Sequence, residues 1–347
     1  MSAPVISFFN NKGGVGKTSL IYHLAWMYAD NDWRVLAADL DPQANLTATF
    51  LKEDRLESVV FEYGDEADTI YECVQPLIRG VGDVADPVLE HIEADSLSEN
   101  LALLSGDLSL SKFEDQLAGA WPRCADGEER AFRVASAFWR IMQQAARQHE
   151  ADLVLMDLGP NLGAINRSAL IAADYVVIPL APDLFSIKGM RNLGPTLRKW
   201  REQWNDRLNK NPAQDLSLPE GKMQPVGYTV QQHSVRLDRP AKAYRRWIGR
   251  MPNVYREEIL EELPDESVDV RSDHHCLALL KHYRSLMPLA QEARKPMFKL
   301  KYADGAIGAH AQAAKDTYAD FKDLADEISR RIGTRPSRLA AQGHTDS

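Results

Sequence analysis

A glycine-rich loop near the start of the chain constrains the fold more than any other stretch. It reads Asn-Lys-Gly-Gly-Val-Gly-Lys-Thr over residues 11–18, after the apolar run 5–9 and before an apolar-periodic segment that begins at Leu20. A strand, a glycine loop and a helix in this order gather backbone N–H groups and the positive end of a helix dipole at one point, where polyphosphate binds. Glycines at positions 14 and 16 let the backbone approach phosphate without an intervening β-carbon.

The two residues after the last glycine carry the expected chemistry. Lys17 is expected to reach the β- and γ-phosphates, and the Thr18 hydroxyl is expected to coordinate Mg²⁺. A chance glycine turn and a Rossmann loop are the alternatives. The Rossmann pattern needs a third glycine where this chain has Ser19, so a phosphate loop is the favoured interpretation.

The loop departs from the common P-loop pattern at one position, because Asn11 stands six residues before Lys17, where a glycine is expected. The run Lys-Gly-Gly-Val-Gly-Lys-Thr at 12–18 resembles the deviant P-loop of the ParA/MinD family. That resemblance implies ATP and Mg²⁺ as ligands, and it implies that Lys12 crosses a dimer interface to the phosphates of the other subunit's ATP. The residues that it implies for nucleotide binding are Lys12, Gly13, Gly14, Val15, Gly16, Lys17, Thr18 and Ser19.

A second motif, Asp-Leu-Asp-Pro-Gln at 39–43, follows a short apolar run at 35–38. Ligands of open α/β sheets bind at the carboxyl ends of strands, so these carboxylates should face the phosphates. The motif resembles the D-x-D-P-Q block of the same family, which implies that Asp41 orients or activates the attacking water and that Asp39 supports it near Mg²⁺. Such a carboxylate acts mainly by positioning. A polar turn at a strand end is the alternative, since Asp-Pro is common there.

A third motif is the apolar run 153–156, which ends in Asp157. A strand with a terminal aspartate is the Walker B arrangement, in which the carboxylate holds a Mg²⁺-bound water, although a core strand can also end in a polar residue. The family continues with Asp-x-Pro-Pro, whereas Gly159 replaces the first proline here and leaves the turn more flexible. The candidate Mg²⁺ ligands are Thr18, Asp39, Asp41 and Asp157, and the candidate catalytic residues are Lys12, Lys17 and Asp41.

Short apolar strands alternate with helical segments, which predicts an α/β fold with a doubly wound, mostly parallel sheet flanked by helices, as in P-loop NTPases. Further strands are expected at 101–104, 173–180 and 226–230, and an exposed loop at 119–128. The family places an adenine-contacting residue just after the last of these strands, where this chain has Gln231 or Gln232; a satisfied strand-end amide is the alternative. We expect a single domain over 1–334, with a divergent segment at 234–285 and a disordered tail at 335–347.

The charge of the chain is unevenly distributed. Residues 1–150 hold 12 Lys and Arg against 25 Asp and Glu, a balance of −13, whereas residues 151–347 hold 29 against 25, a balance of +4. A nucleic-acid surface would therefore lie in the second half. The basic residues that surround Tyr244 and Trp247 there are Arg236, Arg239, Lys242, Arg245, Arg246 and Arg250. They could grip a DNA backbone without reading sequence, or they could form a partner-docking, phosphate-sensing or plain amphipathic helix.

Composition and patterning argue against a membrane-spanning, secreted or zinc-binding protein. With 44% hydrophobic and 26% charged residues the chain is typical of a soluble protein, and no apolar run approaches the roughly 20 residues that cross a bilayer. The N-terminus has no secretory pattern, and the three cysteines never form a C-x-x-C pair, which favours a reducing cytoplasm and no zinc site. MinD uses a terminal amphipathic helix as a membrane anchor, but the stripe Phe321, Leu324, Ile328 and Ile332 is short, which favours docking on the core.

The motifs and the resemblance together predict an ATPase that forms a nucleotide-sandwich homodimer and hydrolyses ATP slowly as a switch. Plasmid or chromosome partition on non-specific DNA, aided by a partner protein that stimulates hydrolysis, is the expected use, with the protein in the cytoplasm on the nucleoid. Two other classes stay open. The protein could position or regulate a protein cargo without DNA, or it could transfer phosphate to a substrate on the same fold.

Overall fold

A computed structural model of the chain describes residues 2–61, 68–92, 99–232, 241–265, 267–281, 283 and 286–337. The strands are β1 (Val5–Phe8), β2 (Val35–Asp39), β3 (Glu90–His91), β4 (Leu101–Leu104), β5 (Leu153–Asp157), β6 (Tyr175–Leu180), β7 (Gln224–Gln232) and β8 (Cys276–Lys281). The α-helices are α1 (Lys17–Asp30), α2 (Asn45–Phe50), α3 (Glu53–Phe61), α4 (Ile70–Arg79), α5 (Glu114–Ala125), α6 (Glu129–Ala135), α7 (Ala137–His149), α8 (Ala164–Ile171), α9 (Leu184–Leu208), α10 (Ala241–Ile248), α11 (Met251–Val254), α12 (Leu286–Ala293) and α13 (Ala309–Ile332). Short helices η1 (Leu108–Phe113), η2 (Tyr255–Leu260), η3 (Met297–Lys299) and η4 (Tyr302–Asp304) complete the described elements.

The sheet has the order β3-β4-β2-β5-β1-β6-β7-β8, and only β3 runs antiparallel to its neighbour. Strand β1 lies between β5 and β6, so the chain winds outward from β1 in both directions. This confirms the predicted doubly wound, mostly parallel sheet. Because parallel strands end at the same edge, the register sets Asp157 beside Phe8 on one side and beside Asp39 on the other.

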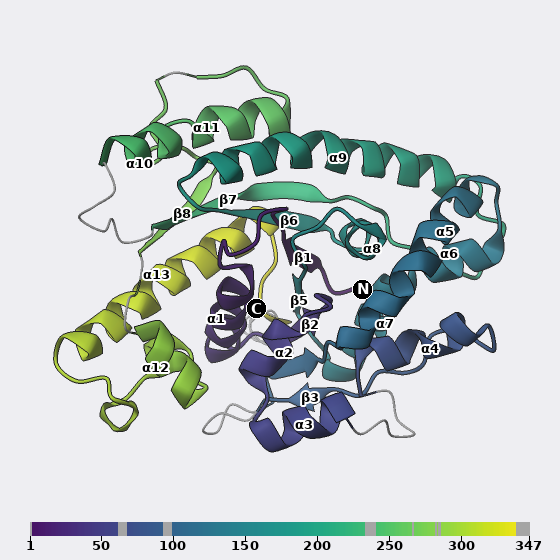
Figure 1. Cartoon of the computed structure of the whole chain (residues 1–347), viewed down its shortest axis with the longest axis horizontal. Coiled ribbons are helices and arrows are strands. Elements are labelled where there is room, and N and C mark those ends of the chain that lie inside the picture. Colours follow the sequence, from purple (N-terminus) through teal and green to yellow (C-terminus); the bar gives the residue numbers. More distant parts are fainter. Residues whose placement is uncertain are drawn as a thin grey trace, which may run out of the picture.

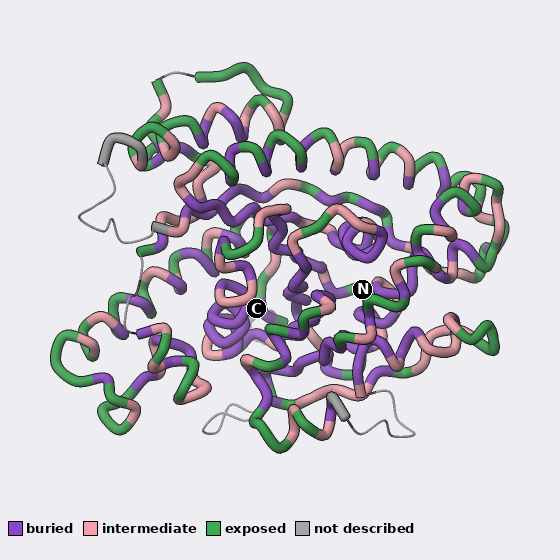
Figure 2. The backbone as a smooth tube through the Cα atoms, viewed as in Figure 1, coloured by how far each residue is buried: buried purple, intermediate pink, exposed green. Residues whose placement is uncertain are grey.

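Helices cover both faces of the sheet (Figure 1). Helices α1, α2, α12 and α13 pack on one face, and α4 to α9 with α11 pack on the other. Every residue of β1, β2, β4 and β5 is buried, which is visible as the continuous purple centre of Figure 2. Strands covered on both faces read as unbroken apolar runs, which is why these four were visible in the sequence.

Two elements differ from the sequence expectation. The loop expected at 119–128 is wrong, because α5 continues to Ala125 and buries Ala120, Trp121 and Cys124. Strand β8 was not predicted and falls inside the divergent segment 234–285, where it extends the sheet beside β7. Its apolar run 277–280 follows the turn residues Ser272 and Asp273, a strand signal that was missed.

The C-terminal helix docks on the core, as the apolar stripe predicted. Phe321, Leu324, Ile328 and Ile332 are all buried among residues of α1 and β8. In the part of the chain that the structure describes, no helix is long and apolar enough to span a membrane. The disordered tail expected at 335–347 stays a prediction; near its start, the Ser337 N–H donates to Asp152 Oδ1 at 3.0 Å. Residues 338–347 lie outside the described residues.

We predict that Leu324→Ala lowers the free energy of unfolding by about 2–5 kcal/mol, because it removes a fully buried side chain from between α13 and α1. Urea unfolding followed by circular dichroism measures the change. The exposed Lys315→Ala variant on the same helix is the control and should stay within about 0.5 kcal/mol of the wild type. Equal stability of all three proteins would contradict core docking of α13.

Candidate functional site

The glycine loop joins the central strand β1 to helix α1 and leaves the start of that helix open. Gly14 and Gly16 adopt φ of 71° and 78°, in the left-handed region that favours glycine. No side chain caps α1, so its first N–H groups remain free to bind an anion. Gly16 is also tightly packed, because a β-carbon there would lie 3.0 Å from Gln231 Nε2. The loop thus has the open N–H groups and the close backbone approach that a phosphate requires.

Lys17 lies buried at the base of this loop. Its Nζ donates to the carbonyl of Asn10 at 3.5 Å. Burial lowers the pKa of Lys17, while the nearby charges of Asp157 and Asp41 raise it. A buried ammonium group with so few hydrogen-bond acceptors is suited to bind a strongly negative ligand such as polyphosphate.

Thr18 and Asp157 join α1 to strand β5. The Thr18 hydroxyl donates to Asp157 Oδ2 at 2.6 Å, and Asp157 is fully buried. Burial is the main cause that raises the pKa of Asp157 to about 8, and the charge of Asp39 adds to it. A hydroxyl and a carboxylate held this way are oxygen ligands of the kind Mg²⁺ prefers, and a divalent cation would offset the cost of the buried negative charge.

Asp39 has hydrogen-bond partners on both carboxylate oxygens. Oδ2 accepts from the backbone N–H and the hydroxyl of Thr47, each at 2.8 Å, and Oδ1 accepts from the Asp41 N–H at 3.2 Å. Burial raises the pKa of Asp39 to about 6, while the Thr47 hydrogen bonds lower it. The structure therefore shows Asp39 anchoring the start of α2, a contact with Thr47 that sequence reasoning did not identify.

Asp41 lines the open side of the site, two residues beyond the end of β2. Its Oδ1 accepts from the Gln43 N–H at 3.0 Å. A β-carbon at Gly159 would lie 3.1 Å from the same oxygen, so the turn after Asp157 passes directly beside Asp41. The absence of a side chain at position 159 allows this approach.

Lys12 lies on the outer side of the loop and forms an ion pair with Asp183. Asp183 is the N-cap of α9, where it also accepts from the Ser186 N–H at 2.9 Å. Hydrogen bonds from Lys12 and from backbone N–H groups outweigh burial and hold the pKa of Asp183 below its usual range. Sequence reasoning did not identify Asp183; an aspartate three residues before Ser186 at a helix start is an N-cap signal that could have indicated its place.

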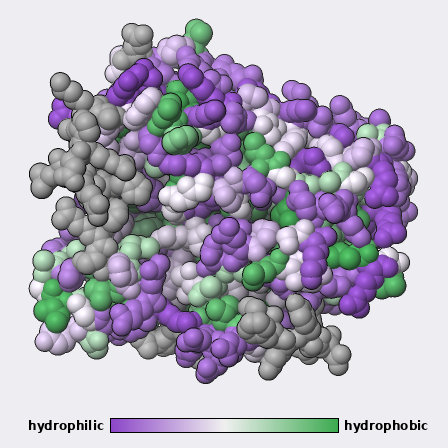
Figure 3. All heavy atoms as spheres, viewed as in Figure 1, coloured by the Kyte–Doolittle hydropathy of each residue, from purple (hydrophilic) through white to green (hydrophobic). Residues whose placement is uncertain are grey.

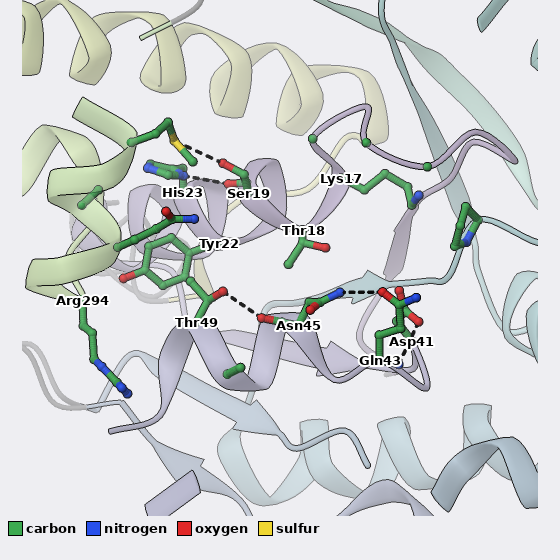
Figure 4. Close-up of a pocket in the computed structure, with 18 residues that line it drawn as sticks. Lys17, Thr18, Ser19, Tyr22, His23, Asp41, Gln43, Asn45, Thr49 and Arg294 are labelled. Atoms are coloured by element: carbon green, nitrogen blue, oxygen red, sulfur yellow. Dashed lines mark hydrogen bonds between the residues drawn. The ribbon is translucent and has the colours of Figure 1, made fainter. Parts of the chain in front are cut away.

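A cavity of about 610 Å³ opens over the loop and runs between α1, α2 and α12 (Figure 4). In Figure 4, Lys17, Thr18 and Asp41 lie toward one end of it and Tyr22, Thr49 and Arg294 toward the other. Gly13, Pro160 and Gln291 also line it. Gln231 is not among the lining residues; its side chain packs behind Gly16. The contribution of α12 was not predicted, because nothing in its own sequence links it to the glycine loop.

The described residues hold no group of three or more His, Cys, Asp or Glu side chains arranged to bind a metal. Mg²⁺ commonly takes one or two carboxylates and completes its octahedron with water and substrate phosphates. The Thr18 and Asp157 oxygens fit that pattern, with Asp41 nearby on the cavity wall.

A parallel sheet with a glycine loop, a buried lysine and a strand-end aspartate at its carboxyl edge defines a P-loop nucleotide-binding protein. The chain belongs to the ParA/MinD-type P-loop ATPases: the family described as AAA domain (AAA_31) matches residues 3–210. Soj, the sporulation initiation inhibitor protein of Bacillus subtilis strain 168, is 30% identical over 204 residues, which are 59% of this chain and 68% of Soj. The uncharacterized protein MJECL24 of Methanocaldococcus jannaschii is 26% identical over 250 residues, 72% of this chain and 81% of that protein.

Solved structures share the fold across nearly the whole chain. The protein DIP2308 from Corynebacterium diphtheriae has a TM-score of 0.70 at 24% identity and covers 95% of this chain and 98% of its own. The pNOB8 ParA bound to nonspecific DNA has a TM-score of 0.60 at 17% identity, with 95% and 99% covered. A putative plasmid partition protein from Borrelia burgdorferi B31 bound to AMPPNP has a TM-score of 0.58 at 16% identity, with 95% and 99% covered.

The raised pKa of Asp157 predicts a pH-dependent stability. Between the pKa of an unfolded aspartate and about 8, Asp157 holds a proton in the folded chain that it releases in the unfolded chain, so its contribution to stability falls as pH rises through this window. In metal-free buffer, the free energy of unfolding of the wild type should therefore fall from pH 6 to pH 8 more steeply than that of Asp157→Asn. Denaturant titrations at both pH values measure this, and parallel lines for the two proteins would contradict a protonated Asp157.

Proposed function

We propose that the protein is a ParA-like ATPase that binds Mg·ATP, forms an ATP-dependent homodimer and uses slow hydrolysis as a switch in plasmid or chromosome partition on non-specific DNA. The observation that carries this proposal is that the open loop, Lys17 and Thr18 line one cavity, with Asp157 bound to the Thr18 hydroxyl beside it. Membership of the family supports nucleotide hydrolysis in general. A partner protein that stimulates hydrolysis, and a location on the nucleoid in the cytoplasm, are part of the same proposal.

The loop residues 12–19 would hold the triphosphate. Backbone N–H groups around Gly13, Gly14 and Gly16 would surround the phosphates, and the buried Lys17 would neutralise them. Val15 is buried, so its backbone alone is available for this purpose. AMPPNP in the Borrelia protein supports an adenine nucleotide as the ligand here.

Thr18 and three aspartates would have different roles in hydrolysis. Thr18 and Asp157 would hold Mg²⁺, which when bound supplies positive charge to the phosphoryl oxygens. Asp41 would orient the attacking water from the cavity wall, and Asp39 would support it by fixing the start of α2 through Thr47.

Lys12 would act as the dimer-forming residue. In the single chain it is held by Asp183, and the next two residues, Leu184 and Phe185, are 49% and 67% exposed although both are large and apolar. A second copy that brought its own phosphates to Lys12 would offer a more negative partner than one carboxylate and would cover these side chains. On this proposal the ion pair with Asp183 keeps Lys12 occupied until ATP is present.

Residues 1–334 are proposed to form one domain. Strand β8 supports this, because it lies within the divergent segment 234–285 and yet pairs with β7 in the common sheet. Helix α13 supports it as well, since it packs on α1 from the other end of the chain.

Helix α10 is proposed to bind the DNA backbone. Arg245 and Arg246 of this helix and Arg250, two residues beyond its end, are exposed. The guanidinium carbons of Arg246 and Arg250 lie 5.0 and 5.3 Å from the centre of the Trp247 ring. The neighbouring Arg191 and Arg198 of α9 are already paired with Glu258 and Glu261.

The face seen in Figure 3 is mainly hydrophilic, with apolar side chains only in small groups. The pNOB8 ParA bound to nonspecific DNA supports this use of the fold. Arg236 and Arg239 lie outside the described residues, as does the side chain of Lys242.

We predict that Lys17→Ala and Asp41→Ala separate binding from hydrolysis. Lys17→Ala should weaken ATP binding at least tenfold, because the phosphates lose their buried cation. Asp41→Ala should bind ATP within about threefold of the wild type yet hydrolyse it at least 10²-fold more slowly, the lower range for a removed catalytic base. Calorimetry and a phosphate-release assay measure the two quantities, with the exposed Asp126→Ala as control. Hydrolysis that survives in Asp41→Ala would contradict the assigned role.

We predict that changing Arg245 and Arg246 together to alanine weakens DNA binding in a gel shift with ATP and lowers the salt slope of the remaining binding by about 2, one unit for each lost phosphate contact. The matched control changes Lys52 and Arg79, two exposed cations of the acidic first half, and should leave binding unchanged. If the wild type shifts no DNA in ATP, the protein-cargo alternative replaces partition on DNA.

A further inference from the structure

Helix α8 begins directly behind the turn that follows Asp157, and its first N–H groups are held from another element. Its N-cap, Gly163, offers no side chain to cap it. Instead, the N–H of Ala164 donates to Glu114 Oε1 at 2.5 Å and the N–H of Ile165 donates to Glu114 Oε2 at 2.8 Å. Both carboxylate oxygens of a residue on α5 therefore fix the position at which α8 starts.

The contact between Glu114 and α8 is both close and electrostatically favourable. A β-carbon at Gly163 would lie 2.6 Å from Glu114 Oε1, so the carboxylate in its present position passes close to the backbone at position 163. The negative charge stands at the positive end of the α8 dipole. Glu114 is also the first residue of α5, so the same charge favours the start of its own helix.

Hydrogen bonds from α8 and within the turn hold residues 158–163 against the start of α8. Asn166, which is fully buried in α8, donates through Nδ2 to the carbonyls of Gly159 and Asn161 at 2.8 and 2.6 Å. The N–H of Gly163 donates to Asn161 Oδ1 at 2.9 Å. Because Gly159 passes beside Asp41 Oδ1, a displacement of the start of α8 would carry the turn away from Asp41.

Helix α5 is anchored firmly enough to act as a fixed support. Trp121 of α5 stacks on Trp204 of α9 with ring centroids 6.0 Å apart, and the Trp121 carbonyl accepts from Arg207 Nε at 2.9 Å. Leu117 and Ala120 are buried against the same core. A carboxylate held on a rigid helix can fix a neighbouring loop more tightly than one on a loop.

We propose that Glu114 is a positioning residue for hydrolysis, which sets the start of α8 and through it places the 158–163 turn against Asp41. The proposal rests on the proposed ATPase function and adds a residue that does not line the cavity. Glu114 would act on the step after nucleotide binding, because its carboxylate contacts the start of α8, whereas the phosphates would be held by the glycine loop and by Lys17 at the start of α1.

The experiment compares Glu114→Gln and Glu114→Ala with Asp115→Asn, which changes the charge of the neighbouring exposed carboxylate in the same helix turn. Hydrogen exchange by mass spectrometry on a peptide covering 158–168 reports on the turn without requiring activity. ATP affinity and kcat are measured on the same proteins. The Gln variant keeps the side-chain volume and one acceptor oxygen, so it tests the role even if the Ala variant folds poorly.

We expect faster exchange in this peptide for both Glu114 variants, an ATP affinity within threefold of the wild type, and a kcat lowered about tenfold in Glu114→Ala and less in Glu114→Gln, in keeping with the loss of charge-assisted hydrogen bonds. Asp115→Asn should match the wild type in all three. Unchanged exchange, or a kcat that falls only in parallel with affinity and melting temperature, would overturn the proposal. If the wild type hydrolyses no ATP, the proposed function fails, while the exchange result still decides whether Glu114 holds the turn.

Discussion

The hydrogen bond from the Thr18 hydroxyl to the fully buried Asp157 is the interaction on which the site depends. It joins the first turn of α1 to the end of β5, and the strand register places Asp39 in line with it. A charged carboxylate in such a position is costly unless it finds cations and hydrogen-bond donors, which accounts for the raised pKa of Asp157 and for Lys17 beside it. The same arrangement suits the site to Mg²⁺. It also suits the site to an anionic ligand that arrives bound to a metal ion, because the metal offsets the repulsion between the ligand and the carboxylates.

The strands and loop of this site could be predicted because their signals are local. Buried parallel strands read as apolar runs, and parallel strands end at one edge, so Thr18 and Asp157 could be placed together from their positions alone. The contacts of Asp183 and Glu114 could not, since Lys12 and Ala164 lie 171 and 50 residues away along the chain. The Asp39–Thr47 hydrogen bonds span only eight residues, but they require α2 to be placed beside the end of β2. Strand β8 was also missed, although its apolar run 277–280 follows the turn residues Ser272 and Asp273.

Helix α9 connects the phosphate loop to the basic segment. Its first turns hold Lys12 through Asp183, and a β-carbon at Gly189 would lie 2.7 Å from the side chains of Asn10 and Asn11. Further along, Arg198 donates to the Glu258 carbonyl at 2.6 Å, just beyond α11. A single helix thus packs against both the residue proposed to sense a second copy and the segment that follows the exposed arginines of α10.

The central claim is that ATP frees Lys12 from Asp183 so that it acts across a dimer. Mass in solution, measured by light scattering with ATP, with ADP and without nucleotide, tests this most directly on the wild type, Lys12→Ala and Asp183→Asn. The account predicts a monomer without ATP, a dimer with ATP in the wild type, no dimer for Lys12→Ala, and a dimer at lower ATP concentration for Asp183→Asn. A mass that ignores nucleotide, or a Lys12→Ala protein that still dimerises with ATP, would contradict it.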